Sequence, residues 1–233
     1  MAILRLKYRK VGYMKFLSHL DMVRLMERSF RRAQMPLEFS QGFNPRPKIN
    51  FAAPLSVGVT SDAEVMEVVL TKKVDIAALL EHQREAFPAG IELVAGTFVD
   101  QVGQSSPKLM GSVSSCQYLI SVINKDTYSK EVVETWLNDF MKQDAIMIEK
   151  VNKKKKVVQK DIKPAIRSFA LVSVELEGHM VLSAHLDAGS ESNLRAEDLM
   201  HALDGFPGVE MDLETLRLHR QKINAGDKDI YDL

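Results

Sequence analysis

Cysteine is almost absent from this sequence, and its scarcity excludes several classes of protein. Cys116 is the only cysteine among 233 residues, so no disulfide can form within the chain. A single thiol also excludes a four-thiolate zinc or iron–sulfur site built by this chain alone. The six histidines show no spacing typical of a metal site. We therefore predict no cofactor and name no metal-binding residues.

Long apolar runs are also missing. The sequence contains no stretch of about eighteen consecutive apolar residues, the length that a membrane-spanning helix needs. Residues 3–8 alternate apolar and basic side chains as a strand does, and they do not form the charged-then-apolar pattern of a leader. We expect a cytoplasmic protein that binds no membrane.

Net charge is missing too, because 31 basic residues balance 31 acidic ones. This balance argues against indiscriminate binding to nucleic acid but allows a basic patch on one surface. A local excess occurs between Tyr13 and Lys48, where seven basic residues stand against Asp21, Glu27 and Glu38. The seven are Lys15, Arg24, Arg28, Arg31, Arg32, Arg46 and Lys48.

A helix is predicted to begin at Ser18. Serine is a favoured N-cap, and Asp21 places a carboxylate in the first turn, where the positive end of the helix dipole favours it. Apolar residues follow at steps of three or four until Pro36 ends the helix, which predicts one packed face and one arginine-rich face. The apolar residues are Leu20, Val23, Met26, Phe30 and Ala33.

The loop after Pro36 combines turn-forming residues with aromatic and basic side chains. Phe39 and Phe43 could stack on bases or on a planar ligand, while Arg46 and Lys48 contact phosphates. Alternatively, both rings pack into the core and the prolines only stiffen a long connection. We prefer the binding interpretation because the cations of the helix and the loop converge. The candidate binding residues are Arg24, Arg28, Arg31, Phe39, Gln41, Phe43, Asn44, Arg46 and Lys48.

His19 is the one candidate catalytic residue. In the first turn of a helix the dipole favours the neutral imidazole, which suits a base or a hydrogen-bond partner for a phosphate. Capping alone explains Ser18 and Asp21, however. The alternative is that His19 has only a structural role.

A second candidate binding site follows a predicted strand in the other half of the chain. Asp187, Gly189, Ser190 and Asn193 belong to a Gly/Ser turn that leads into a predicted helix with Asn193 as its N-cap. Backbone N–H groups at such a turn can hold an anion, although a plain helix start explains the same residues.

A dense group of lysines precedes this turn. Lys150, Lys153 to Lys156, Lys160 and Lys163 predict a cationic ribbon. Such a run is usually a solvated tip, but beside another basic surface it could also grip RNA.

The predicted elements follow the order strand, helix, strand, strand, helix, strand in both halves of the chain. This order is typical of a ferredoxin-like domain. Residues 101–115 are rich in Ser, Gly, Gln and Pro, which indicates a linker. We therefore predict an α+β protein of two tandem ferredoxin-like (βαββαβ) domains with antiparallel sheets. The first is 1-100, with the basic helix and loop, and the second is 112-233, with the lysine-rich ribbon.

Four stretches of the sequence resemble the bacterial family of radical SAM-linked proteins. They are residues 16–24, 39–48, 55–58 and 187–190. The resemblance implies an association with a radical SAM enzyme, and because this chain has a single cysteine the cluster would belong to that partner. Family members typically carry His where Asn44 stands here.

Three hypotheses follow. The first is a non-catalytic protein that binds RNA, or presents a substrate, for a radical SAM enzyme in RNA modification or maturation. The second is a metal-independent endoribonuclease that uses His19. The third is a protein–protein adaptor for the radical SAM partner.

Overall fold

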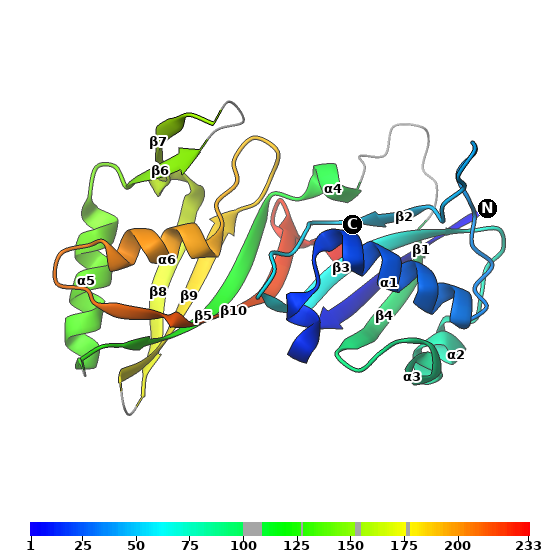
Figure 1. Cartoon of the computed structure of the whole chain (residues 1–233), viewed down its shortest axis with the longest axis horizontal. Helices are drawn as coiled ribbons and strands as arrows, with labels where there is room; N and C mark the ends of the chain where they lie inside the picture. The colour runs from blue at the N-terminus through cyan, green and yellow to red at the C-terminus, as the bar shows by residue number, and fades with distance from the viewer. Residues whose placement is uncertain (100–108, 127, 152–154, 176–177) are drawn as a thin grey trace. The chain divides into compact units, whose positions relative to one another are not determined.

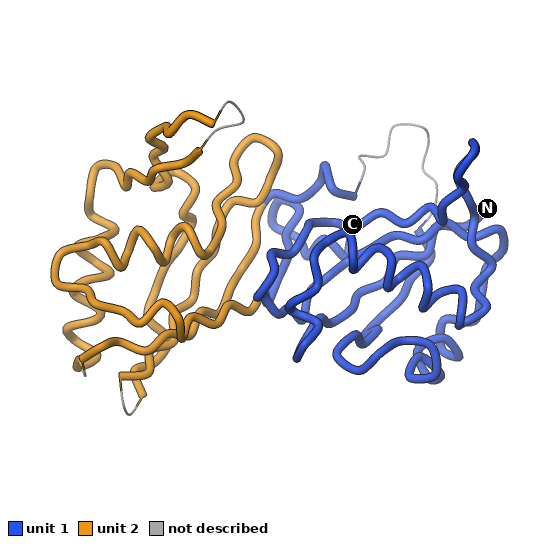
Figure 2. The backbone as a smooth tube through the Cα atoms, in the orientation of Figure 1, with its two compact units in different colours: residues 1–114, 220–233 blue, residues 115–219 orange. Residues whose placement is uncertain are grey.

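The computed structural model describes residues 1–99, 109–126, 128–151, 155–175 and 178–233 (Figure 1). It confirms an α+β protein whose strands pair mainly antiparallel. The chain forms two compact units, which are Met1–Ser114 with Arg220–Leu233, and Ser115–His219 (Figure 2). The predicted domains 1-100 and 112-233 differ from this division, because Arg220–Leu233 belongs to the first unit. Most of the predicted linker lies outside the described residues.

The first unit is built around a sheet in which β1 lies between β4 and β3. Both β1 pairings are antiparallel, and β2 also pairs antiparallel with β3. The last part of β10 is the further neighbour of β3. The elements of this unit are β1 (Ala2–Lys10), η1 (Gly12–Phe16), α1 (His19–Arg32), β2 (Ile49–Phe51), β3 (Thr60–Leu70), α2 (Ile76–Glu81), α3 (Gln83–Ala86), β4 (Ile91–Val99), α4 (Leu109–Ser112), the end of β10 (Met211–Ala225), β11 (Lys228–Asp229) and η4 (Ile230–Asp232).

Helix α1 packs on one face of this sheet through side chains spaced by four residues (Figure 1). Met22, Met26 and Phe30 are buried in the same core cluster as the β1 side chains Leu4 and Leu6. Burying a side chain of this size contributes about 1.5–3 kcal/mol. The helix is therefore fixed by its packing as well as by its cap.

The predicted apolar stripe was wrong at its first residue. Leu20 is 67% exposed, whereas Val23 and Ala33 are half-buried at the margin of the core. The buried stripe begins at Met22 instead, because the sheet contacts that side of the helix.

Two other parts of this unit contain only short elements. The helices α2 and α3 meet at His82, whose Nδ1 lies 3.0 Å from the Ala78 carbonyl oxygen. Strand β2 ends at Phe51. Beyond it, Pro54 has no N–H for a ladder, and the guanidinium of Arg220 donates to its carbonyl oxygen.

The second unit is built around a sheet of order β10-β5-β9-β8. The β5/β9 and β8/β9 pairings are antiparallel, and β6 and β7 form a separate two-stranded ribbon. The elements of this unit are β5 (Ser115–Asn124), α5 (Lys130–Lys142), β6 (Met147–Val151), β7 (Val157–Asp161), η2 (Lys163–Ala165), β8 (Ile166–Val174), β9 (His179–Asp187), α6 (Ala196–Asp204) and the first part of β10.

The last helix begins later than predicted. Arg195, not Asn193, is the N-cap of α6. Asn193 is instead bridged to Ala188, and the N–H of Leu194 donates to the Asp187 carbonyl (2.9 Å). Asn193 is therefore part of a bridged turn that precedes the helix.

Candidate nucleic-acid interface

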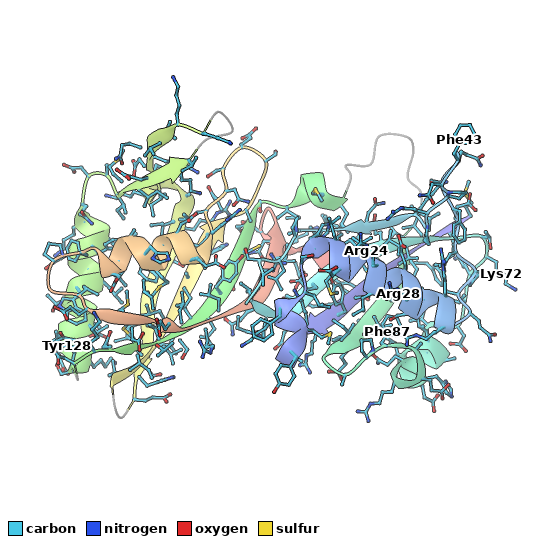
Figure 3. All side chains as sticks on the ribbon, viewed as in Figure 1. Arg24, Arg28, Phe43, Lys72, Phe87 and Tyr128 are labelled. Atoms are coloured by element: carbon cyan, nitrogen blue, oxygen red, sulfur yellow. The ribbon has the colours of Figure 1, made fainter. Side chains whose placement is uncertain are left out.

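Three arginines form a stripe along the exposed side of α1. Arg24, Arg28 and Arg31 follow each other at steps of four and three residues, so they lie one above the other on successive turns. At 100° per residue this stripe is opposite the buried residues of the helix. All three side chains are exposed and together span roughly 10 Å of the helix. Figure 3 shows Arg24 and Arg28 on this helix.

The start of α1 is capped as the sequence predicts. The N–H of Asp21 donates to Ser18 Oγ (3.3 Å), and the Ser18 hydroxyl donates to the Asp21 carboxylate (2.6 Å). This reciprocal pair fixes the first turn, from which the arginine stripe begins.

The loop between α1 and β2 forms a narrow structure that we call the arch, residues 38–48. Its two legs are joined by hydrogen bonds from Lys48 N to Glu38 O and from Ser40 N to Arg46 O, both 2.9 Å. Its base is joined to β3, where Glu38 N donates to Val69 O (2.9 Å) and Val69 N donates to Lys48 O (3.0 Å). The arch is thus a braced extension of the sheet with residues 41–45 at its tip.

The predicted binding residues on the arch lie at its surface. Phe43 is fully exposed at the tip (Figure 3), and Phe39 is 37% exposed on a leg. The alternative in which both rings pack into the core is therefore wrong. Gln41, Asn44 and Arg46 are exposed as well, and Lys48 is half-buried.

Arg31 connects the arginine stripe to the arch. Its guanidinium carbon lies 5.7 Å from the centre of the Phe39 ring, the geometry of a cation–π contact. This contact joins the stripe to one leg of the arch, and the arch also carries Arg46 and Lys48. We call the stripe and the arch together the basic surface.

The charges of the basic surface are weakly compensated. Arg24 lies 3.7 Å from Asp21 and Lys48 lies 3.5 Å from Glu38, and such exposed pairs hold their partners loosely. Arg28 and Arg46 have no ion pair among the described residues. Positive charge therefore remains available to an anionic ligand.

The cations of β1 behave differently. Arg5 pairs with Glu67 at 2.7 Å, Lys7 pairs with Asp229 at 3.1 Å, and Arg9 lies between two carboxylates. Each of these side chains has a close acidic partner, so this strand offers little uncompensated charge.

Lys72 belongs near the basic surface, although sequence reasoning missed it. The preceding residue, Thr71, donates its N–H to the Pro36 carbonyl (2.8 Å), just before the arch begins. Lys72 is exposed, and Figure 3 shows it at the same end of the unit as Phe43. The position of Lys72 beside the arch depends on the pairing of Leu37 with Leu70. The sequence does not reveal this register.

His19 packs against an aromatic ring. Its imidazole meets Phe51 edge-on, with ring centroids 5.4 Å apart and an angle of 81°. The described residues give His19 no hydrogen-bonded carboxylate, so the oriented acid–base pair typical of a catalytic histidine is missing from them. Close by, Gly58 N donates to the Lys15 carbonyl (2.8 Å), which brings the loop after β2 to η1.

A buried polar cluster, which the sequence analysis did not predict, holds this region in place. Glu64 and Arg220 form an ion pair at 2.6 Å, and Arg220 also donates to the Ala53 carbonyl (3.2 Å). Lys10 Nζ donates to the Leu17 carbonyl (3.1 Å), immediately before the cap of α1. The cluster therefore positions both the loop after β2 and the start of the helix.

Burial shifts the protonation of two members of the cluster. Loss of hydration lowers the pKa of Lys10, nearby Glu64 raises it in part, and Arg220 lowers it further. Burial likewise raises the pKa of Tyr8 well above its ordinary value, and the charge of Glu64 adds to this effect. The sequence signal of the cluster is a charged residue, Glu64, between apolar residues of β3.

The Gly/Ser turn of the second unit is held by its neighbours. Arg167 Nε donates to Asp187 Oδ1 (2.6 Å), and Lys160 Nζ donates to the Asn193 carbonyl (3.1 Å). Gly189 and Ser190 are separated from the helix by residues 191–195. Anion binding at this turn stays a prediction, without a contribution from the start of α6.

Two lysines of the predicted ribbon, Lys150 and Lys160, lie in the paired strands β6 and β7, and Lys163 follows in η2. Lys150 pairs with Asp198 of α6 (2.8 Å), and Lys163 Nζ donates to the Gln143 carbonyl. Lys153 and Lys154 lie outside the described residues. At least part of the charge in this ribbon is therefore used within the second unit.

Two absences hold for the part of the chain that the structure describes. No group of three or more His, Cys, Asp or Glu side chains there is placed to hold a metal ion. Nor is any helix there long and apolar enough to cross a membrane.

Comparison with known proteins identifies a family but no curated relative. Residues 4–196 match a family described as an uncharacterized protein conserved in bacteria (DUF2344). A comparison with curated proteins found no match.

Two solved structures are similar to this chain, although their sequences are distant from it. A chain in the crystal structure of a Cbf5-Nop10-Gar1 complex matches with a TM-score of 0.50 and 10% identity, over 95% of this chain and 48% of that one. A chain of the archaeal box H/ACA sRNP Nop10-Cbf5 complex matches with a TM-score of 0.48 and 9% identity, over 94% and 46%. This chain spans about half the length of either, and at such identity the first likeness shows a shared fold alone.

Proposed function

We propose that this chain, which belongs to the family of uncharacterized bacterial proteins matched by residues 4–196, binds RNA along its basic surface. The observation that carries the proposal is the contact between Arg31 and Phe39, which joins the exposed arginines of α1 to the arch that carries Arg46. Arg28 and Arg46 lack ion pairs among the described residues, so phosphates would be their counterions. The proposal rests on this geometry rather than on the likeness of fold.

Phosphate neutralisation is the expected source of affinity. Each phosphate contact releases a condensed counterion, so log K for a single strand falls with log salt by about 0.7 per contact. The three stripe arginines and Arg46 supply up to four such contacts. Binding should therefore be strongest at low salt and should depend little on sequence.

We further propose an accessory role for the protein in the cytoplasm. The resemblance to radical SAM-linked proteins supports a partner enzyme that performs RNA modification or maturation while this chain presents the RNA. The single cysteine, Cys116, is buried, so the cluster chemistry would belong to the partner. Co-purification of the tagged protein from its native host, followed by mass spectrometry, would test for that enzyme.

Each unit is proposed to be a ferredoxin-like domain. In the first unit β4, β1, β3 and β2 follow the order that a βαββαβ chain adopts in this fold, with antiparallel neighbours. In the second unit β10, β5, β9 and β8 occupy the corresponding places. The order of strands and helices along the chain supports the proposal in both units.

The proposed function is tested by titrating a labelled single-stranded RNA with the purified protein across a salt series. The variant Arg28→Ala/Arg46→Ala should weaken binding and reduce the salt slope by about 1.4, two contacts at about 0.7 each. Arg9→Ala is the matched control, because Arg9 is an arginine of the same unit that already has carboxylate partners.

Two results would refute RNA binding by the basic surface. One is the absence of binding at low salt. The other is a double variant whose salt slope is unchanged and whose affinity falls no further than that of Arg9→Ala. Circular dichroism of each variant verifies that the fold is intact.

A further inference from the structure

The tip of the arch presents a single aromatic ring to solvent, and we propose that this ring stacks on an unpaired base of the bound RNA. The inference rests on the proposed RNA-binding function and names its substrate class. That class is RNA with at least one base free of a pairing partner, as in a single strand, a loop or a bulge.

Phe43 has the exposure and the support that a stacking platform needs. It is fully exposed, whereas Phe30 and Phe51 in the same unit are buried. The arch below it is closed by the bond from Ser40 N to Arg46 O (2.9 Å) and by the bond from Arg46 N to Ser40 Oγ (3.1 Å). The ring is therefore carried outward on a braced turn and gains nothing from the core.

The backbone beside Phe43 is shaped for this presentation. Gly42 has φ of +126°, a conformation that side-chain-bearing residues rarely adopt. This glycine lets the chain reverse within residues 41–45, so that Phe43 stands at the extreme of the tip.

The two predicted stacking rings differ in exposure, because Phe43 is fully exposed and Phe39 is 37% exposed. Phe39 is covered on one side by the Arg31 guanidinium at 5.7 Å, and its backbone is bridged to Pro47. Its role is to join the stripe to the arch. Phe43 is therefore the more accessible of the two predicted stacking rings.

An exposed ring on a protruding tip distinguishes unpaired from paired bases. In a duplex both faces of a base are covered by its neighbours, whereas a free base can be splayed out and stacked on an aromatic side chain. Two neighbours of Phe43 suit the same ligand. Asn44 is exposed and carries both a donor and an acceptor for a base edge, and Arg46 can meet the adjoining phosphate.

Charge favours RNA over a protein as the occupant of the tip. A protein bound at the tip would have to supply an acidic partner for the guanidinium of Arg46. It would also leave the positive charge of Arg28 and Arg31 along α1 unmatched unless its acidic surface extended that far. A polyanion with exposed ring faces satisfies both the cations and Phe43.

The test compares three RNAs of one sequence: the single strand, the fully paired duplex, and that duplex with one bulged nucleotide. Each is titrated at constant salt with the wild-type protein and with Phe43→Leu, Phe43→Trp and Phe16→Leu. Phe43→Leu keeps an apolar side chain but removes the ring. Phe16→Leu is the matched control, since Phe16 is another exposed aromatic of the first unit, at 60% exposure.

The inference predicts that wild type prefers the single strand and the bulged duplex to the paired duplex. Phe43→Leu should lose that preference, with affinity for the unpaired RNAs falling roughly 5- to 150-fold, the effect of one base stack. Phe43→Trp should restore the preference, and RNA should quench the fluorescence of the new indole. Phe16→Leu should behave as wild type.

The outcomes separate this inference from the function on which it rests. Salt-dependent binding with equal affinity for all three RNAs, or with no effect of Phe43→Leu, overturns the stacking inference and leaves RNA binding intact. Absence of binding to every RNA at low salt overturns both. In a third outcome, a protein co-purifies with wild type but not with Phe43→Leu, and the RNA affinity of the two is the same. This result also overturns the inference, because the tip would then bind protein.

Discussion

Arg220 and Glu64 form a buried ion pair although 156 residues separate them in the chain. Arg220 Nη2 lies 2.6 Å from one carboxylate oxygen and 2.7 Å from the other, and the two side chains are only 3% and 4% exposed. The same guanidinium donates to the carbonyls of Ala53 and Pro54. One ion pair therefore joins the C-terminal segment, β3 and the loop after β2 within the first unit.

Removing one member of this pair should destabilise the protein severely. Glu64→Ala leaves a buried guanidinium without its counterion, which costs about 3–5 kcal/mol of unfolding free energy. The double variant Glu64→Leu/Arg220→Met should cost clearly less, because no charge stays buried. Urea denaturation of both variants measures the difference. A single variant no less stable than the double one would contradict this account of the pair.

His19 should contribute to packing rather than to catalysis. His19→Ala removes the edge-on contact with Phe51 and should cost about 0.5–1.5 kcal/mol beyond the loss of buried area. RNA affinity should stay unchanged, because His19 lies away from the arginine stripe. The control for the loss of an imidazole is His201→Ala, because His201 is an exposed histidine of α6.

Gel analysis of labelled RNA incubated with each protein decides between packing and catalysis at His19. RNA that stays intact with wild type supports the packing role. Cleavage by wild type that disappears in His19→Ala, but not in His201→Ala, would establish the endoribonuclease hypothesis instead.

Arg31 and Phe39 should be energetically coupled. A cation–π contact at an exposed site is worth about 0.5–1 kcal/mol, so the double-mutant cycle Arg31→Ala, Phe39→Ala and both together should return a coupling energy of that size in protein stability. If the two effects are simply additive, the guanidinium and the ring do not interact in solution. In RNA titrations Phe39→Leu should weaken binding less than Arg46→Ala, since Phe39 acts through Arg31.

Local features of the first unit could be predicted from the sequence. The start of α1 depends on Ser18 and Asp21, which lie three residues apart, so capping chemistry reveals it without any knowledge of the fold. The arginine stripe is also local, because helical periodicity alone places Arg24, Arg28 and Arg31 on one side. The order of the strands and helices followed from hydrophobic patterns for the same reason.

Features that depend on distant residues could not be predicted. Which side of α1 is buried depends on where the sheet lies, and this is why Leu20 was wrongly assigned to the core. The loop after β2 is held by Arg220, which lies far along the chain. The different fates of Phe39 and Phe43 depend on Arg31 and on the pairing of the arch with β3, neither of which a linear motif specifies.

Lys10 should make stability depend on alkaline pH. Because burial lowers the pKa of Lys10 in the folded protein, the unfolded chain binds the proton more tightly between that lowered pKa and the ordinary lysine value. The free energy of unfolding contributed by Lys10 should therefore rise with pH across this window. Lys10→Met, which keeps the length of the side chain without its charge, should abolish the rise.

The measurement is urea unfolding of wild type and Lys10→Met over an alkaline pH series. Tyr8 acts in the opposite direction, because its raised pKa means that the unfolded chain loses the phenol proton first and stability falls above the ordinary tyrosine value. That fall occurs in both proteins, so the difference between the two curves isolates Lys10. The difference should change in favour of wild type as pH increases, and parallel curves would show that Lys10 titrates alike in the folded and unfolded states.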